Sequence, residues 1–73
     1  MDTLPRRLRM LRRQANKTLA DVADAASISV SFLSDMEHGR TLPALDTLER
    51  IASVFNLSIG ELLVNVRITL DDE

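Results

Sequence analysis

Two short amphipathic segments, separated by only three residues, constrain the fold of this chain more than any other feature. Residues 18–26 place apolar side chains at helical spacing, and residues 30–38 do so again. The connection between them, Ser27-Ile28-Ser29, has room only for a tight turn. Ala23 is small at a position where two such helices cross closely. The stretch therefore predicts two packed helices joined by a turn.

Helix start and stop signals recur along the rest of the chain. Thr3, Thr18, Ser29 and Ser58 are placed to cap helices, with Pro5 in a first turn, Asp21 and Glu61 completing capping boxes, and Gly39 and Asn56 ending helices. Together these signals predict five helices, near residues 4–15, 18–26, 30–38, 45–55 and 59–63. The expected fold class is all-α.

The pattern changes after the fifth helix. Val64, Val66, Ile68 and Leu70 alternate with polar residues, which is the period of a β-strand. A lone strand has unpaired backbone groups, so we expect it to pair with the same strand of a second copy across a two-fold axis. The alternatives are a disordered tail or packing on its own domain. Residues 1–63 are thus expected to form one domain and residues 64–73 a dimerisation segment.

Composition excludes several classes of protein. The 73 residues contain no Cys and a single His, so neither disulfides nor a zinc site is expected. No apolar run is long enough to cross a membrane, and a cytoplasmic protein is expected. No nucleophile–base pair, carboxylate pair or phosphate-binding loop can be assembled, so we expect no enzyme activity and no cofactor.

Charge is unevenly distributed along the chain. The formal net charge is −2, yet residues 1–17 carry five Arg and one Lys against one acid, whereas residues 18–73 carry three Arg against ten acids. A local basic patch is what contact with phosphates requires. A solvated charged helix face is an equally good explanation.

The outer face of the predicted third helix is short and polar. At about 100° per residue, Phe32, Leu33 and Met36 share an apolar arc. Ser31, Ser34, Asp35 and His38 fall on the opposite side. Without long Lys or Glu side chains, this face can approach another surface closely.

The stretch TLADVADAASISVSFLSDMEHGRTLPALDTLERIASVFNLSIGELL, residues 18–63, resembles the phage-repressor-like helix-turn-helix family of the Cro, lambda repressor and Xre type. Val22-Ala23, Ile28-Ser29, Leu33-Ser34, Glu37, Gly39-Arg40, Pro43 and Leu48 match its pattern in register. Two residues depart from it: Ser27 replaces the usual turn Gly, and Leu19 replaces a Gln that commonly braces a phosphate. The resemblance implies a five-helix lambda-repressor-like domain whose helix-turn-helix proper covers residues 18–38.

The resemblance also implies which residues contact DNA. The third helix enters the major groove, and Val30, Ser31, Ser34 and Asp35 face base edges. For Asp35, intramolecular pairing or rejection of wrong sequences is an equal alternative. The implied phosphate contacts are Thr18, Leu19, Ser29, Phe32, His38 and Arg40. Leu19 can contribute only through its backbone, and core packing is almost as good an explanation for Phe32.

One ion pair is implied as well. Arg12 on the first helix and Glu37 on the third occupy positions that form an Arg–Glu pair in the family. Burying either charge alone would be costly, whereas a bidentate pair is tolerable.

The function expected from these observations is sequence-specific binding to double-stranded operator DNA by a homodimeric regulator, a repressor or autoregulator. With no room here for a ligand-sensing domain, control would come from dimerisation, concentration or a partner protein. The alternative is an antitoxin, with a toxin as its partner, or another protein-interaction module of a toxin–antitoxin or restriction-modification system.

Overall fold

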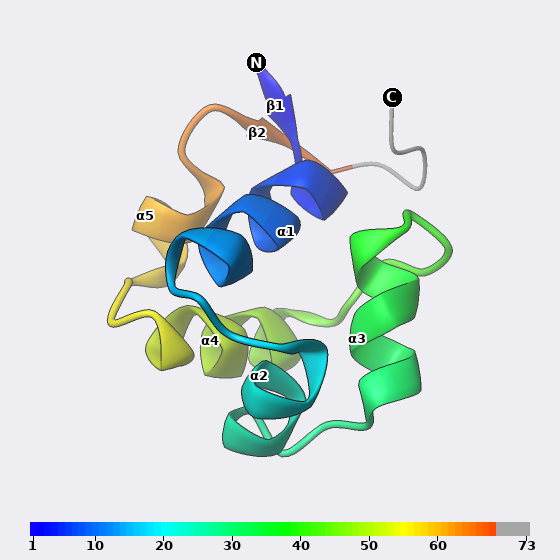
Figure 1. Ribbon diagram of the computed structural model, residues 1–73. Helices are drawn as coiled ribbons and strands as arrows, with labels where there is room; N and C mark the ends of the chain where they lie inside the picture. The colour runs from blue at the N-terminus through cyan, green and yellow to red at the C-terminus, as the bar shows by residue number, and fades with distance from the viewer. Residues whose placement is uncertain (69–73) are drawn as a thin grey trace.

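A computed structural model describes residues 1–68 of the chain. In this part of the chain, five helices and two short strands follow the order β1 (Asp2–Thr3), α1 (Leu4–Gln14), α2 (Leu19–Ala25), α3 (Val30–Glu37), α4 (Leu45–Val54), α5 (Ile59–Leu63) and β2 (Val66–Arg67) (Figure 1). The five helices expected from the sequence are confirmed. Across residues 1–68 no helix has the length and apolar character needed to span a membrane.

The helices surround one small core. α3 stands at one side of the domain and packs on α1 and α2, while α4 lies against α2 and α5 (Figure 1). The core is made of aliphatic side chains from all five helices: Leu4, Leu8, Val22, Ala23, Ala26, Leu33, Met36, Leu48, Ile51, Ala52 and Leu62. Neither of the two Phe residues is fully buried, so small side chains set the spacing between helices.

Four of the helices end in the same way. A residue with positive φ follows the last turn at Asn16 (56°), Ser27 (59°), Gly39 (71°) and Asn56 (58°). In each case the next N–H donates back across the turn, as from Ile28 to the carbonyl of Ala23 at 2.9 Å. This is the Schellman motif, which reverses the chain while satisfying the last carbonyl groups. Glycine occupies only one of the four positions, so Ser27 carries real backbone strain.

Side-chain caps define the starts of α2 and α5. The hydroxyls of Thr18 and Ser58 accept from the N–H groups of Asp21 and Glu61 at 3.0 and 3.1 Å, and the two carboxylates accept in return from the capping residues' own N–H groups. These backbone hydrogen bonds, followed by those to the hydroxyls, lower the pKa of Asp21 and of Glu61. Both capping boxes predicted from the sequence are confirmed.

The two strands form a parallel pair that joins the beginning of the domain to its end. Asp2 lies opposite Val66 and Thr3 opposite Arg67, and the N–H of Asp2 donates to the carbonyl of Asn65 at 3.0 Å. The expectation of a strand without a partner in its own chain is therefore wrong. The sequence did not predict β1, because two residues are too few to show a period.

The expected strand 64–70 is also too long. Val64 caps the end of α5, and Asn65 has a φ of 54°, so β2 begins only at Val66. Ile68 follows the strand, and Leu70 lies outside the described residues. Val64 and Asn65 follow the same alternation of apolar and polar residues although they lie in a turn. The pattern therefore predicted a longer strand than the structure contains.

Thr3 occupies the predicted N-cap position of α1 but does not cap it. Its side chain makes no hydrogen bond to the helix, and its buried Oγ1 has no hydrogen-bond partner among residues 1–68, while the residue is only 2% exposed. An unpaired buried hydroxyl costs stability. Thr3 therefore contributes through the packing of its β-branched side chain and not through its oxygen.

We expect Ser27→Gly to stabilise the domain by about 1 kcal/mol and to raise the Tm by about 4–8 °C, because glycine adopts a positive φ without strain. Urea and thermal unfolding measure both. Ser53→Gly, on the exposed side of α4, is the matched control and should destabilise by about 0.5 kcal/mol. Equal effects at the two positions would contradict the assignment of strain to the turn.

Thr3→Val is expected to stabilise the domain by about 1 kcal/mol, since it replaces an unpaired buried hydroxyl with a methyl group of the same shape. The same change at Thr18, whose hydroxyl caps α2, should destabilise by about 1 kcal/mol. Chemical unfolding of the two variants decides the matter, and a loss of stability in Thr3→Val would show that Oγ1 has a partner.

Candidate nucleic-acid interface

α3 presents one buried face and one open face. Leu33, Met36 and Glu37 are buried, and they attach the helix to the core. On the other side Val30 and Ser31 are exposed, while Ser34 and Asp35 are half-buried. The four residues expected to face base edges therefore lie on one accessible surface of short side chains.

The start of α3 is set by the turn that precedes it. The hydroxyl of Ser29 accepts from the N–H of Phe32 at 3.0 Å, which fixes the first turn of the helix. From α4, Nη1 of Arg50 donates to the carbonyls of Ala26 and Ser27 at 3.3 and 3.5 Å. Arg50 thus holds the end of α2 and the turn. This contact was not predicted from the sequence. Arg50 lies 24 positions after Ala26 and 23 after Ser27, and residues so far apart carry no periodic signal.

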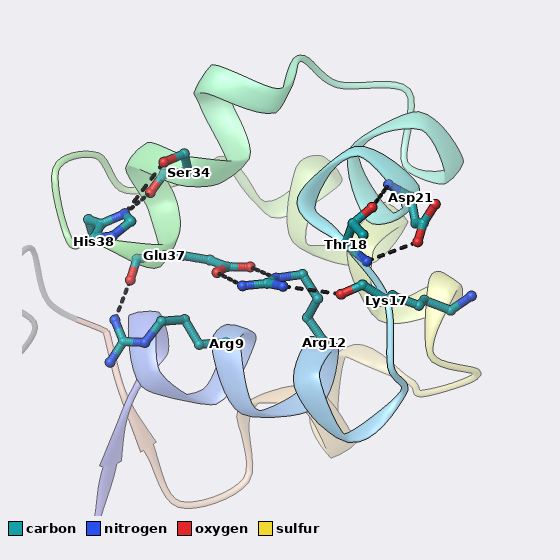
Figure 2. A network of polar contacts seen from close by, with 8 residues as sticks. All are labelled: Arg9, Arg12, Lys17, Thr18, Asp21, Ser34, Glu37 and His38. Atoms are coloured by element: carbon teal, nitrogen blue, oxygen red, sulfur yellow. Dashed lines mark hydrogen bonds and ion pairs between the residues drawn. The ribbon is translucent and has the colours of Figure 1, made fainter.

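A buried ion pair fastens the other end of α3 to α1 (Figure 2). Nε and Nη2 of Arg12 donate to the two carboxylate oxygens of Glu37 at 2.8 and 2.9 Å, and the Glu37 side chain is only 2% exposed. Its hydrogen bond to Glu37 raises the pKa of Arg12. Nη1 of the same guanidinium donates to the carbonyl of Lys17 at 3.1 Å. The structure thus brings together the two residues that the resemblance paired.

Other arginines of α1 also reach inward. Arg9 donates to the backbone carbonyl of Glu37, as Figure 2 shows, and Arg7 donates to the carbonyls of Glu61 and Leu62, both at 3.1 Å. A guanidinium at the carbonyl end of a helix is favourable for both hydrogen bonding and the helix dipole. Much of the basic segment therefore holds helices together, which the charge count alone could not distinguish from phosphate contact.

The candidate phosphate contacts at the starts of α2 and α3 differ in their accessibility. Thr18 and Ser29 are exposed, although their hydroxyls already accept helix-capping bonds. Leu19 and Phe32 are partly buried and pack against the core. For Leu19 this leaves the backbone as the group available to a phosphate, and for Phe32 core packing accounts for much of its surface.

Two further candidates lie at the C-terminal end of α3. Nδ1 of His38 donates to the carbonyl of Ser34 at 2.7 Å, which leaves the far side of the ring exposed (Figure 2). The guanidinium of Arg40 lies 3.5 Å from the carboxylate of Asp35. Both side chains are thus positioned by residues of the open face of α3.

The described residues contain no pocket and no group of three or more His, Cys, Asp or Glu side chains placed to hold a metal ion. The candidate site is the convex surface formed by α3 and its two ends.

Comparison with known proteins identifies the family. The family model for the helix-turn-helix domain matches residues 4–64. The HTH-type transcriptional regulator DdrOP3 of Deinococcus deserti is 48% identical over 60 residues, which cover 82% of this chain and 46% of that protein. The chain belongs to the Xre-type helix-turn-helix family.

Other helix-turn-helix proteins extend the comparison. The immunity repressor of Bacillus phage phi105 is 30% identical over 84% of this chain and 42% of its own length. The crystal structure of SinR of Bacillus subtilis in complex with DNA superposes with a TM-score of 0.76 at 27% identity, over 84% of this chain and 98% of that one. The chain spans less than half of the length of the two curated relatives, DdrOP3 and the immunity repressor.

We expect Arg12→Ala to destabilise the domain by about 3 kcal/mol, because it leaves the buried carboxylate of Glu37 without its counter-charge. Glu37→Ala should cost less, because the Arg12 side chain is 16% exposed and keeps its hydrogen bond to the carbonyl of Lys17. In a double-mutant cycle followed by urea unfolding, the second substitution should cost far less than the first, with a coupling of about 1.5 kcal/mol or more. The exposed pair Asp2–Arg6 is the control, with an expected coupling below about 0.5 kcal/mol. Independent effects of Arg12 and Glu37 would refute the lock.

Proposed function

We propose that this chain is the DNA-binding unit of a sequence-specific transcriptional regulator, a repressor or autoregulator, and that α3 enters the major groove. The observation that carries the proposal is the open face of α3, whose short side chains stand on a helix fixed at both ends. A helix without long side chains can lie close to base edges. The likeness to SinR, which was crystallised in complex with DNA, supports DNA binding.

The proposed base contacts follow from the chemistry of each side chain. Ser31 and Ser34 can bond to more than one base, and the Val30 methyl groups suit the methyl group of thymine. Asp35 can accept from the amino group of cytosine. Thr18, Leu19, Ser29, Phe32, His38 and Arg40 form the proposed ring of phosphate contacts, through hydroxyls, helix-start N–H groups and charge.

We further propose that the active form is a homodimer on a palindromic operator, in the cytoplasm. Within residues 1–68, β2 has a partner on one edge only, and Val64 and Ile68 beside it are 59% and 53% exposed. A second copy pairing there would cover these apolar side chains and provide the two-fold axis that two half-sites about 34 Å apart require. In this arrangement residues 1–63 bind DNA and residues 64–73 join the copies.

One observation favours a second function, a protein-interaction module such as an antitoxin. Leu42 and Leu45, in the connection after α3 and at the start of α4, are 46% and 61% exposed. Exposed aliphatic side chains close together in sequence suit a protein partner such as a toxin.

Selection from random double-stranded DNA with the purified chain tests the proposal. We expect an enriched palindrome, bound more weakly as salt rises because phosphate contacts release counterions. Ser31→Ala should relax the base preference at one position per half-site, whereas Ser53→Ala on α4 should leave the enriched sequence unchanged. Enrichment of a single half-site would contradict the dimer. No enrichment at all would favour the interaction module.

A further inference from the structure

Two oppositely charged residues meet where α3 ends. Nη1 of Arg40 lies 3.5 Å from Oδ1 of Asp35, and the two side chains are 64% and 46% exposed. The main chain joins the same residues, since the N–H of Arg40 donates to the carbonyl of Asp35 at 2.9 Å. Gly39, with a φ of 71°, turns the chain back to make this possible. The pair is therefore positioned by the helix end and not only by two flexible side chains.

The two partners have opposite requirements on DNA. A carboxylate on the open face of α3 is repelled by phosphates unless a base offers it an amino group. A guanidinium is attracted to phosphates, but Asp35 neutralises part of its charge while the pair is closed. Opening the pair is favourable only when Asp35 also finds a donor, because a carboxylate left alone next to DNA is repelled by the phosphates that Arg40 would gain.

We propose that Asp35 and Arg40 form a sequence-dependent switch, an inference that rests on the DNA-binding function proposed above. Where the groove presents an exocyclic amino group, of cytosine by preference, Asp35 transfers to the base and Arg40 transfers to a phosphate. Where the groove presents no donor, the pair stays closed and Arg40 contributes nothing to phosphate binding. The number of phosphate charges that the protein neutralises thus depends on the sequence under Asp35.

The switch makes a prediction that separate contacts do not. If Arg40 bound phosphate on every sequence, the slope of log affinity against log salt would be the same for all duplexes. With the switch, the slope is steeper on the recognised sequence by about one per half-site, which is the contribution of one phosphate contact.

The experiment measures affinity over a range of salt concentrations for two duplexes of equal length and composition, the sequence enriched by selection and a scrambled version. For Asp35→Asn we expect affinity for scrambled DNA to rise about three- to tenfold and its salt slope to steepen by about one per half-site. For Arg40→Gln we expect weaker binding to both duplexes, because Asp35 loses its counter-charge, but a salt slope that falls by about one per half-site only on the enriched duplex. Glu49→Gln on α4 is the charge-matched control, and it should leave the difference between the two slopes unchanged.

Three results would overturn the switch. Equal wild-type slopes on the two duplexes, or an equal fall in slope on both from Arg40→Gln, would show that Arg40 binds phosphate regardless of sequence. Higher affinity of Asp35→Asn for scrambled DNA without a steeper slope would show that the carboxylate acts by repulsion alone. In each case the DNA-binding function would stand. Absence of salt-dependent binding to either duplex by the wild type would overturn the function and the switch together.

Discussion

The placement of α3 depends on the buried pair between Arg12 and Glu37. The two guanidinium hydrogen bonds fix both the distance and the rotation of α3 relative to α1, which a purely apolar contact would leave looser. Apart from this pair and the hydrogen bond of Arg9 to the carbonyl of Glu37, α3 is held to the core by apolar side chains. Desolvating the two charges costs stability, and the pair in return fixes the orientation of α3. The direction of the open face of α3 depends on that orientation.

Arginine has the same role at several helix ends. Arg7 serves the last carbonyls of α5, Arg9 those of α3, and Arg50 those of α2 and the turn. In each case the guanidinium belongs to a different helix from the carbonyl that it reaches, so each hydrogen bond connects two elements of the fold. A chain with so few aromatic residues gains long-range connections in this way. Such links also tie the position of each helix to the position of its neighbours.

The sequence predicted local structure well and long-range polar contacts poorly. Thr18 with Asp21 and Ser58 with Glu61 are three residues apart, and both boxes form as expected. Asn16 and Asn56 end helices because their side chains tolerate a positive φ, a property that is visible in sequence.

The bonds of Arg7 and Arg50 join residues far apart in the chain, and only the folded backbone determines which carbonyl each reaches. β1 was missed for a related reason, since Asp2 and Thr3 are a strand only because Val66 and Arg67 lie beside them. The inner and outer faces of α3 were read correctly from periodicity. The Arg–Glu pair came from the family resemblance, whereas the Asp35–Arg40 contact had to be seen in the structure.

The parallel pairing of Asp2–Thr3 with Val66–Arg67 has a consequence for biosynthesis. Ribosomes make the chain from its amino end, so α1 can pack on α3 while the partners of its own first turn do not yet exist. The carbonyls that Arg7 reaches and the strand that Asp2 joins are synthesised after all of α1–α4. The start of α1 therefore gains these contacts only once residues 61–67 have been made.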